Sequence, residues 1–198
     1  MTSAALLLAV VSSTEAPVHA EEPVPRSPTP DIVIPAVHGL ALMTVMRATE
    51  TVIWPDPFAR TERFGASYER AFTNPPLFDT SQPFMRWDGD PVIINAGGHA
   101  LFGSELHVRA RACGFGWAGA LAFTAATSAL WEYGFEANGV QPSALDLVYT
   151  PLAGLLLGEA RHQAWRAAGG IDASGWRNVA RAVVDPFGEM ERAFGTRC

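Results

Sequence analysis

Apolar residues along this chain recur at helical spacing, and stretches rich in Pro and Gly separate the apolar segments. No segment shows the alternation of apolar and polar residues that is typical of a strand. The pattern predicts helices at about 38–54, 58–72, 98–113, 116–136, 144–168 and 174–184. We therefore predict an all-α protein, a compact bundle of about five to six helices with hydrophobic, small-residue-rich central helices.

The remaining segments suggest how the chain is organised. Residues 73–98 contain four prolines and several turn signals, which predicts a long ordered loop. Residues 21–31, EEPVPRSPTPD, have no periodicity and predict an extended linker. Residues 32–198 are then expected to form a single helical domain.

The first 20 residues resemble a secretory signal peptide. Ala4–Val11 is a short apolar run, and Val18-His19-Ala20 offers small residues for a signal peptidase, although no basic residue precedes the run. Export would place the two cysteines, Cys113 and Cys198, in an oxidising compartment, where they could pair. Two free thiols are the alternative.

The central apolar segment raises the question of a membrane. Ala112–Trp131 has 20 residues without a formal charge, which meets the length for crossing a bilayer. Its many Gly, Ala, Ser and Thr residues suit a helix packed tightly against other helices, in water or in lipid. The later uncharged run, 147–158, is too short to span. We expect a compact helical core with membrane affinity rather than several spans.

Composition excludes several classes of function. Hydrophobic residues make up 48% and charged residues 17%, below the usual charged share of about 25%, which argues against disorder. The net charge of −6 argues against nucleic-acid binding, which usually requires an excess of basic residues. The basic residues are all Arg, so Schiff-base lysine chemistry and a Lys-containing phosphate loop are excluded. The chain also lacks the HExxH, CxxC, GxSxG and GxGxxG motifs.

Polar residues recur at one-turn spacing within the apolar helices. The two stripes are Ser128, Glu132 and Glu136, and Asp146, Thr150 and Gly154. If the helices fold antiparallel, His99 of the preceding helix can meet Glu132 and Asp146. One His and two carboxylates can bind a divalent metal with an open coordination position. Alternatively, Glu132 can transfer a proton with a pKa raised by burial. The candidate catalytic and metal-ligating residues are therefore His99, Glu132 and Asp146, and no other cofactor is expected.

Simpler interpretations exist for each of the two carboxylates. Asp146 follows Ser143 by three residues, so it fits a helix start of the capping-box type. Glu132 can form a structural ion pair with Arg109 or Arg111.

The other polar residues also have simpler interpretations. His99 can be a hydrogen-bonded core histidine, and Glu136 can face solvent at a helix end. In WDGDP, Asp88 and Asp90 are better explained by a turn than by a calcium loop.

The run from WDGDP to LLLGE resembles the bacterial family called domain of unknown function 3943, over about residues 84–166. Ala100 replaces a Pro that this family usually has, and ELH replaces aromatic residues after Ser104. The matching positions are Trp87, Asp88, Asp90, Asn95, His99, Gly103, Ser104, Arg111, Gly114, Ser128, Trp131, Glu132, Tyr133, Glu136, Pro142, Ser143, Asp146, Thr150, Pro151, Gly154, Gly158 and Glu159.

A looser similarity, in the order of His, Glu, Ser-x-x-Asp and Gly-x-x-x-Gly, is to the VanZ-like membrane and envelope proteins. It implies a helical core in the cell envelope. With the stripes, these resemblances give the candidate binding residues: Asn95, His99, Ser104, Arg111, Ser128, Glu132, Glu136, Asp146, Thr150 and Glu159.

The leading hypothesis is an exported, membrane-associated protein on the periplasmic side of the cell envelope. Its polar cluster would organise the helical core or bind a polar group of a membrane lipid or an envelope glycan. The alternatives are an envelope hydrolase or transferase that uses the His/Glu/Asp cluster, with or without a metal, and a purely structural or assembly factor.

Overall fold

A computed structural model describes residues 29–196 and 198. The predicted signal peptide, residues 1–20, and most of the predicted linker lie outside the described residues. The single domain expected for residues 32–198 stays a prediction.

The described part of the chain is all-helical, as predicted, and its only β-type pairing is an isolated bridge between Leu77 and Ser143. It forms eight α-helices rather than five or six. They are α1 (Val33–Ile53), α2 (Pro55–Phe58), α3 (Phe64–Thr73), α4 (Ala100–Ala112), α5 (Trp117–Leu130), α6 (Ala144–Ala168), α7 (Ser174–Val184) and α8 (Pro186–Ala193). Four short turns complete the order: η1 (Thr61–Arg63), η2 (Ile93–His99), η3 (Trp131–Phe135) and η4 (Glu136–Asn138).

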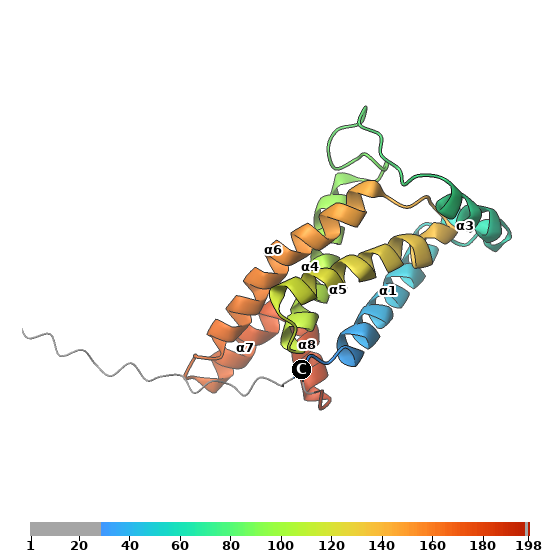
Figure 1. The fold of residues 1–198 in the computed structure, drawn as a ribbon. Coiled ribbons are helices and arrows are strands. Elements are labelled where there is room, and N and C mark those ends of the chain that lie inside the picture. Colours follow the sequence, from blue (N-terminus) through green and yellow to red (C-terminus); the bar gives the residue numbers. More distant parts are fainter. Residues whose placement is uncertain (1–28, 197) are drawn as a thin grey trace, which may run out of the picture.

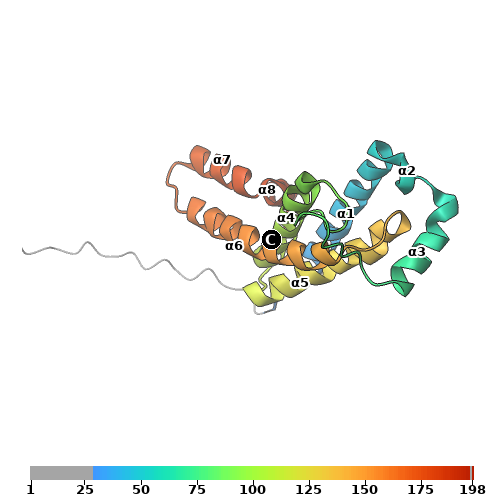
Figure 2. The ribbon, with the colours of Figure 1, turned by 90° about the horizontal axis from the view of Figure 1, so that it is seen from above.

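Helix α4 lies at the centre of the bundle and packs against α6, α5 and α1 (Figures 1 and 2). Nine of its residues in succession, from Phe102 to Ala110, are buried. Met43 of α1, Phe102 and Leu106 of α4 and Trp131 of η3 form the hydrophobic core. The polar side chains of α4 are therefore also removed from water and need partners on the surrounding helices.

Glycines set the distance between α4 and α6. A Cβ on Gly103 would lie 2.2 Å from the carbonyl oxygen of Thr150, and a Cβ on Gly154 would lie 2.6 Å from the carbonyl carbon of Gly103. One turn further along α6, a Cβ on Gly158 would lie 2.7 Å from Cβ of His107. The two helix backbones are thus in direct contact, as in other small-residue helix pairs.

The uncharged segment Ala112–Trp131 is not one helix. Helix α4 ends at Ala112, Gly114 adopts a φ of +92°, and α5 begins only at Trp117. The 14 residues of α5 rise about 21 Å, short of a hydrocarbon core of about 30 Å. Within residues 29–196, no helix has both the length and the apolar character needed to cross a membrane.

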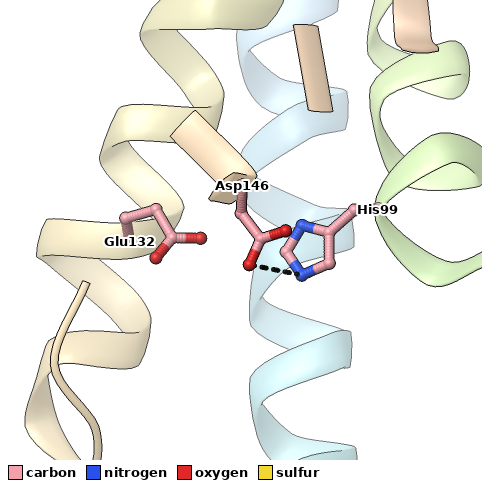
Figure 3. Close-up of side chains that lie close together, drawn as sticks. All are labelled: His99, Glu132 and Asp146. Atoms are coloured by element: carbon pink, nitrogen blue, oxygen red, sulfur yellow. Dashed lines mark ion pairs between the residues drawn. The ribbon is translucent and has the colours of Figure 1, made fainter. Parts of the chain in front are cut away.

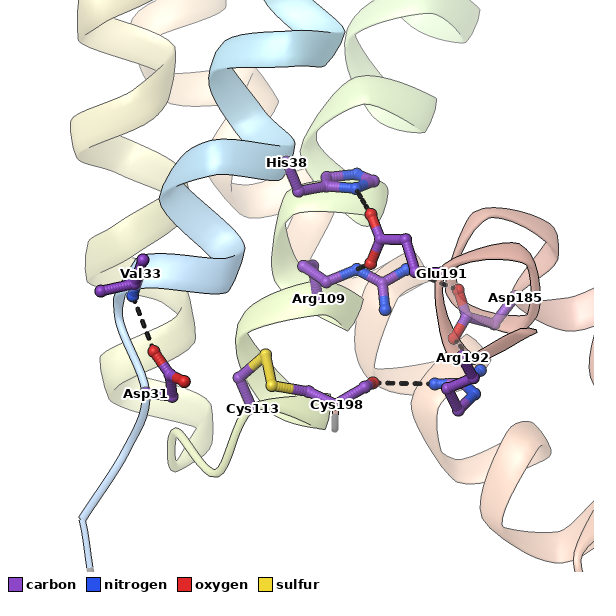
Figure 4. Close-up of a disulfide and its surroundings, with 9 residues drawn as sticks. All are labelled: Asp31, Val33, His38, Arg109, Cys113, Asp185, Glu191, Arg192 and Cys198. Atoms are coloured by element: carbon purple, nitrogen blue, oxygen red, sulfur yellow. Dashed lines mark hydrogen bonds and ion pairs between the residues drawn. A yellow bond between two sulfur atoms is a disulfide. The ribbon is translucent and has the colours of Figure 1, made fainter. Parts of the chain in front are cut away.

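The C-terminal segment folds back onto α4 (Figure 4). Cys113 and Cys198 form a disulfide with Cα atoms 4.9 Å apart, which decides between pairing and free thiols. Helix α8 was not predicted, because its sequence is short and polar. It begins with Pro186 after Asp185, whose carboxylate accepts the Gly188 N–H at 3.0 Å.

Three predicted boundaries were wrong. The helix predicted at 58–72 begins only at Phe64, after the short elements α2 and η1. Helix α1 begins at Val33 rather than near His38, because Pro35 in its first turn is compatible with a helix start. The predicted loop 73–98 ends early, because Ile93–His99 forms a π-helical turn that leads directly into α4.

Gly154→Ala should lower the free energy of unfolding by about 1–3 kcal/mol, because its methyl group would meet the backbone of Gly103. Gly65→Ala is the matched control, since a Cβ there meets nothing within 4 Å and Ala favours helix. Urea unfolding of both variants measures the difference. Equal stability of Gly154→Ala and the wild type would contradict direct backbone contact.

Candidate functional site

Two π-helical turns position the candidate residues. His99 is the last residue of η2, and Glu132 is the second residue of η3. Asp146 lies in the first turn of α6. π-Helical turns are rare and occur frequently at functional sites, so their presence at two of the three residues is a signal that helical periodicity alone does not give.

The predicted meeting of these three side chains is found in the structure (Figure 3). His99, Glu132 and Asp146 each offer one nitrogen or oxygen atom, and these atoms all lie within 4.8 Å of one another. The side chains come from η2, η3 and α6, and the Asp146 carboxyl group lies between the Glu132 carboxyl group and the His99 ring, which both point towards it (Figure 3). The residues are 7%, 1% and 2% exposed, respectively, so the group is enclosed by the fold.

Ser143 connects the carboxylates of the site. Its backbone N–H donates to Glu132 Oε2 at 2.8 Å, and its hydroxyl donates to Asp88 Oδ2 at 2.7 Å. The same hydroxyl accepts the Asp146 N–H at 3.1 Å, so Ser143 is the N-cap of α6, as predicted. In a capping box the side chain of Asp146, three residues after the N-cap, would accept the Ser143 N–H. Here Glu132 accepts it, and the Asp146 carboxyl group is left to face His99.

A hydrogen bond with Thr150 fixes the orientation of His99. Its Nδ1 lies 2.9 Å from Thr150 Oγ1, and its Nε2 lies 3.5 Å from Asp146 Oδ2. The Thr150 contact is a hydrogen bond, whereas 3.5 Å is long for one. Thr150 therefore holds the ring and leaves Nε2 directed at the carboxyl groups.

The loop after α3 covers one side of the site. Asp88 accepts hydrogen bonds from Ser143, from the side chain of Asn95 at 2.8 Å and from the N–H of Asp90 at 3.0 Å. The last of these, with Gly89 at φ +97°, confirms the predicted turn. The turn interpretation missed that Asp88 also belongs to the site, although its place among the family matches was a signal for it.

Burial determines the charges of the central group. Removal from water raises the pKa of Glu132 to about 8, and the charges of Asp88 and Asp90 add to this. Burial, with the negative charge of Glu132, raises the pKa of Asp146 to about 9. Burial also lowers the pKa of His99 to about 4. With no cation bound, all three are neutral near pH 7, so His99 and Asp146 are not an ion pair.

The surroundings are acidic. Burial raises the pKa of Glu50, Asp90 and Glu136, and in Glu136 the neighbouring Glu132 adds to the effect. Glu136, for which a solvent-facing position was the simpler alternative, is half-buried beside Glu132. Burial alone would raise the pKa of Asp88, but its hydrogen bonds from Ser143, Asp90 and Asn95 lower it. Asp88 therefore remains ionised.

Two buried oxygen atoms of the group have no hydrogen-bond partner. They are Oε1 of Glu132 and Oδ1 of Asp146. A buried polar atom without a partner costs about 1–3 kcal/mol, and such atoms are uncommon in native proteins. When Glu132 and Asp146 are ionised, both atoms are acceptors that lack a donor or a cation. In the neutral state each group carries an O–H, and that of Asp146 bonds to the Asp88 carboxylate.

The structural ion pair suggested for Glu132 is wrong, because both candidate arginines bind other acids. Arg111 donates to Glu159 at 2.8 Å. Arg109 contacts Asp185 at 3.1 Å and Glu105 at 3.4 Å.

The structure brings together only part of the predicted binding set. The contacts above link five members of this set: Asn95, His99, Glu132, Asp146 and Thr150. Ser128 joins them because its hydroxyl donates to the Asp146 carbonyl at 3.3 Å. Glu136 lies beside Glu132. Ser104 instead accepts a hydrogen bond from Arg161. Arg111 and Glu159 pair with each other about 18 Å along the helices from the site, at 1.5 Å per residue.

One family model matches the part of the chain that contains the site. The family described as "Domain of unknown function (DUF3943)" matches residues 84–187. The chain belongs to this family. The match contains η2, η3 and the start of α6, and therefore every residue of the central group. No curated protein and no solved structure shows significant similarity to the chain, and the looser similarity to VanZ-like proteins is not shown.

The raised pKa values predict how stability depends on pH. In metal-free buffer between pH 6.5 and 7.5, the unfolded chain has lost the Glu132 and Asp146 protons while the folded chain largely retains them. The free energy of unfolding should therefore fall as pH rises. Asp146→Asn removes one of these protons and should flatten the slope by about 1.4 kcal/mol per pH unit.

Urea unfolding in the presence of a chelator at several pH values measures this slope. Asp172→Asn, at an exposed position, is the matched control and should keep the wild-type slope. Identical slopes for Asp146→Asn and the wild type would mean that Asp146 is already ionised in the fold.

Proposed function

We propose that this protein binds one divalent transition-metal ion through His99 Nε2 and the carboxylates of Glu132 and Asp146. The observation that supports this most strongly is the pair of buried, unpartnered carboxylate oxygens beside an oriented imidazole. A divalent ion would balance two ionised carboxylates and satisfy both oxygens. Ligands of one ion with bonds of about 2.1 Å lie at most about 4.2 Å apart, so shifts of about an ångström would close the group around it.

The enclosure of the group favours an ion over a larger ligand. A glycan or a lipid headgroup needs a concave opening onto the polar residues. The three side chains are 1–7% exposed, and neither of two cavities in the fold is lined by any of them. A metal ion needs no such opening once the fold has closed over it.

The donor set favours particular ions. Imidazole suits Zn²⁺, Fe²⁺ and Ni²⁺, whereas Mg²⁺ prefers oxygen donors and retains its water. Zn²⁺ should therefore bind more tightly than Mn²⁺, and Mn²⁺ more tightly than Mg²⁺. Thr150 would supply the contact to the second ring nitrogen that metal-binding histidines usually have. Ser143 would orient Glu132 through its N–H.

Three protein ligands leave at least one coordination position free, which is also the arrangement of catalytic zinc sites. This favours the alternative of a metal-dependent hydrolase or transferase over a metal-free one. Because the enclosure gives a substrate no route to the ion, the function we propose is metal binding.

We also propose that the protein acts outside the cytoplasm, in association with a membrane of the cell envelope. The disulfide between Cys113 and Cys198 supports an oxidising compartment. Many large apolar side chains are exposed, among them Leu156 at 75% and Trp176 at 72%. Exposed apolar surface on this scale is typical of interaction with membranes or other proteins.

Metal binding is tested by titrating the chelator-treated protein with Zn²⁺ and measuring heat and metal content. One equivalent should bind, and Asp146→Asn and Glu132→Gln should each weaken binding more than 100-fold, since each removes a charged ligand. Thr150→Val keeps the shape of the side chain and should weaken binding about 10- to 100-fold.

Asp172→Asn and Glu62→Gln, both at exposed positions, are the matched controls and should bind as the wild type does. Binding that is equally strong in Glu132→Gln and Asp146→Asn would place the ion elsewhere. Failure of the wild type to bind Zn²⁺, Mn²⁺ or Fe²⁺ would reject the proposal.

Membrane association is tested by extracting bacterial envelopes that contain the full chain, first with salt, then with alkaline carbonate, then with mild detergent. We expect release only by detergent, because apolar contacts resist salt and high pH. Release by salt alone would contradict the association.

A further inference from the structure

The central helices of the bundle have an inverted distribution of polarity. Helix α6 buries the polar and small residues Asp146, Thr150, Gly154 and Gly158. It exposes the large apolar residues Val148, Leu152, Leu156 and Leu157. In a water-surrounded bundle the apolar stripe of a helix faces the core and the polar stripe faces solvent. In α6 the two are exchanged.

Helix α5 repeats this exchange. Its buried residues are Ala120, Thr124, Thr127 and Ser128, whereas Trp117 and Leu130 are 59% and 44% exposed. On α1 the exposed large residues in the first four turns are also aliphatic: Val33, Val37, Leu40 and Val45. Segments 117–130 and 147–158 contain no Asp, Glu or Arg, and neither does 33–46, where the single His38 is bonded to Glu191.

The apolar surface does not lie on one side of the molecule. In Figure 2, α5 lies along the lower edge of the bundle and α7 along the upper edge, with α4 and α6 between them. Helix α7 has no buried residue and exposes Trp176, Val179 and Val183. Exposed charged residues gather instead in the segments before and after these helices, at α2 and α3 and at the α6–α7 turn.

We infer that the outward faces of α1, α5, α6 and α7 contact the acyl chains of a lipid membrane. A single protein partner, or a second copy in a two-fold dimer, covers one continuous face, whereas these faces lie on opposite edges of the bundle. Hydrocarbon surrounds a protein on all sides and tolerates no unpaired charge, which fits the uncharged segments of α1, α5 and α6. The two arginines of α7 have partners within the fold, Arg177 at the Ile171 carbonyl and Arg181 over the Trp165 ring. The contact belongs to the bundle as a whole, because no described helix is long and apolar enough to cross a membrane alone.

This inference rests on the proposed membrane association and adds which surface contacts lipid. Two tryptophans report on opposite edges, Trp117 on α5 and Trp176 on α7. The purified full chain is reconstituted into phosphatidylcholine–phosphatidylglycerol vesicles, with or without lipids brominated on the acyl chains. Brominated chains should quench tryptophan fluorescence, and Trp117→Phe and Trp176→Phe should each remove part of the quenched signal.

A charged substitution tests the same surface without a spectroscopic probe. Leu156→Arg, at a 75% exposed position, should reduce the fraction bound to vesicles about tenfold while leaving the fold intact. Ala167→Arg, exposed at the charged end of the same helix, is the matched control and should bind like the wild type. Circular dichroism verifies that both variants fold.

The outcomes separate the two proposals. A chain that does not bind vesicles, whether as a monomer or as an oligomer, rejects both the membrane association and the lipid-contacting faces. Binding with no quenching of Trp117 and Trp176, or with quenching of only one, retains the association and rejects contact on opposite edges. A smaller quenched signal in each of the two variants, together with weak binding of Leu156→Arg, supports the inference, whereas wild-type binding of Leu156→Arg contradicts it.

Discussion

The close approach of α4 and α6 is the constraint on which the rest of the structure depends. Gly103 and Gly154 have no side chain, so the two backbones touch where any Cβ would collide. This contact brings the N-terminal ends of both helices within reach of each other, and there His99 meets Asp146 and Thr150. A wider spacing would admit water between the helices, and the shifts in pKa that burial produces would be lost. Packing and electrostatics at the site therefore have a common origin.

Much of this could be predicted from sequence because helical periodicity is local information. The four-residue spacing of Ser128, Glu132 and Glu136 and the N-cap Ser143 were enough to predict that His99, Glu132 and Asp146 meet. The partners of Arg109 and Arg111 were not predictable, because Asp185 and Glu159 lie far along the chain and only the packing of α6 and α8 selects them. The role of Asp88 was missed for the same reason, since a turn sequence does not tell what its second carboxylate oxygen contacts.

The small residues on the buried helix faces and the large apolar residues on the exposed faces are two aspects of the same packing. Helices α5 and α6 pack with small residues, Gly, Ala, Ser and Thr, on their buried faces, which leaves little room there for large aliphatic residues. They occupy the outer faces of α5 and α6, while charged groups that would normally coat a surface are buried and paired, as Arg109 and Glu105 are. The sequence is correspondingly low in charge, with 17% charged residues.

The two ends of α4 are stabilised in different ways, one by a disulfide and the other, if the proposed ion binds, by a metal site. The covalent bond between Cys113 and Cys198 closes a ring with a sequence separation of 85, which contains α5 to α8. In the chain-entropy account, such a ring destabilises the unfolded chain by about 4.6 kcal/mol. The opposite end of α4 carries His99, where a bound ion would act on the folded state alone. Because one contribution belongs to the unfolded ensemble and the other to the native state, they should add with little coupling. The same helix can then remain folded when either is absent.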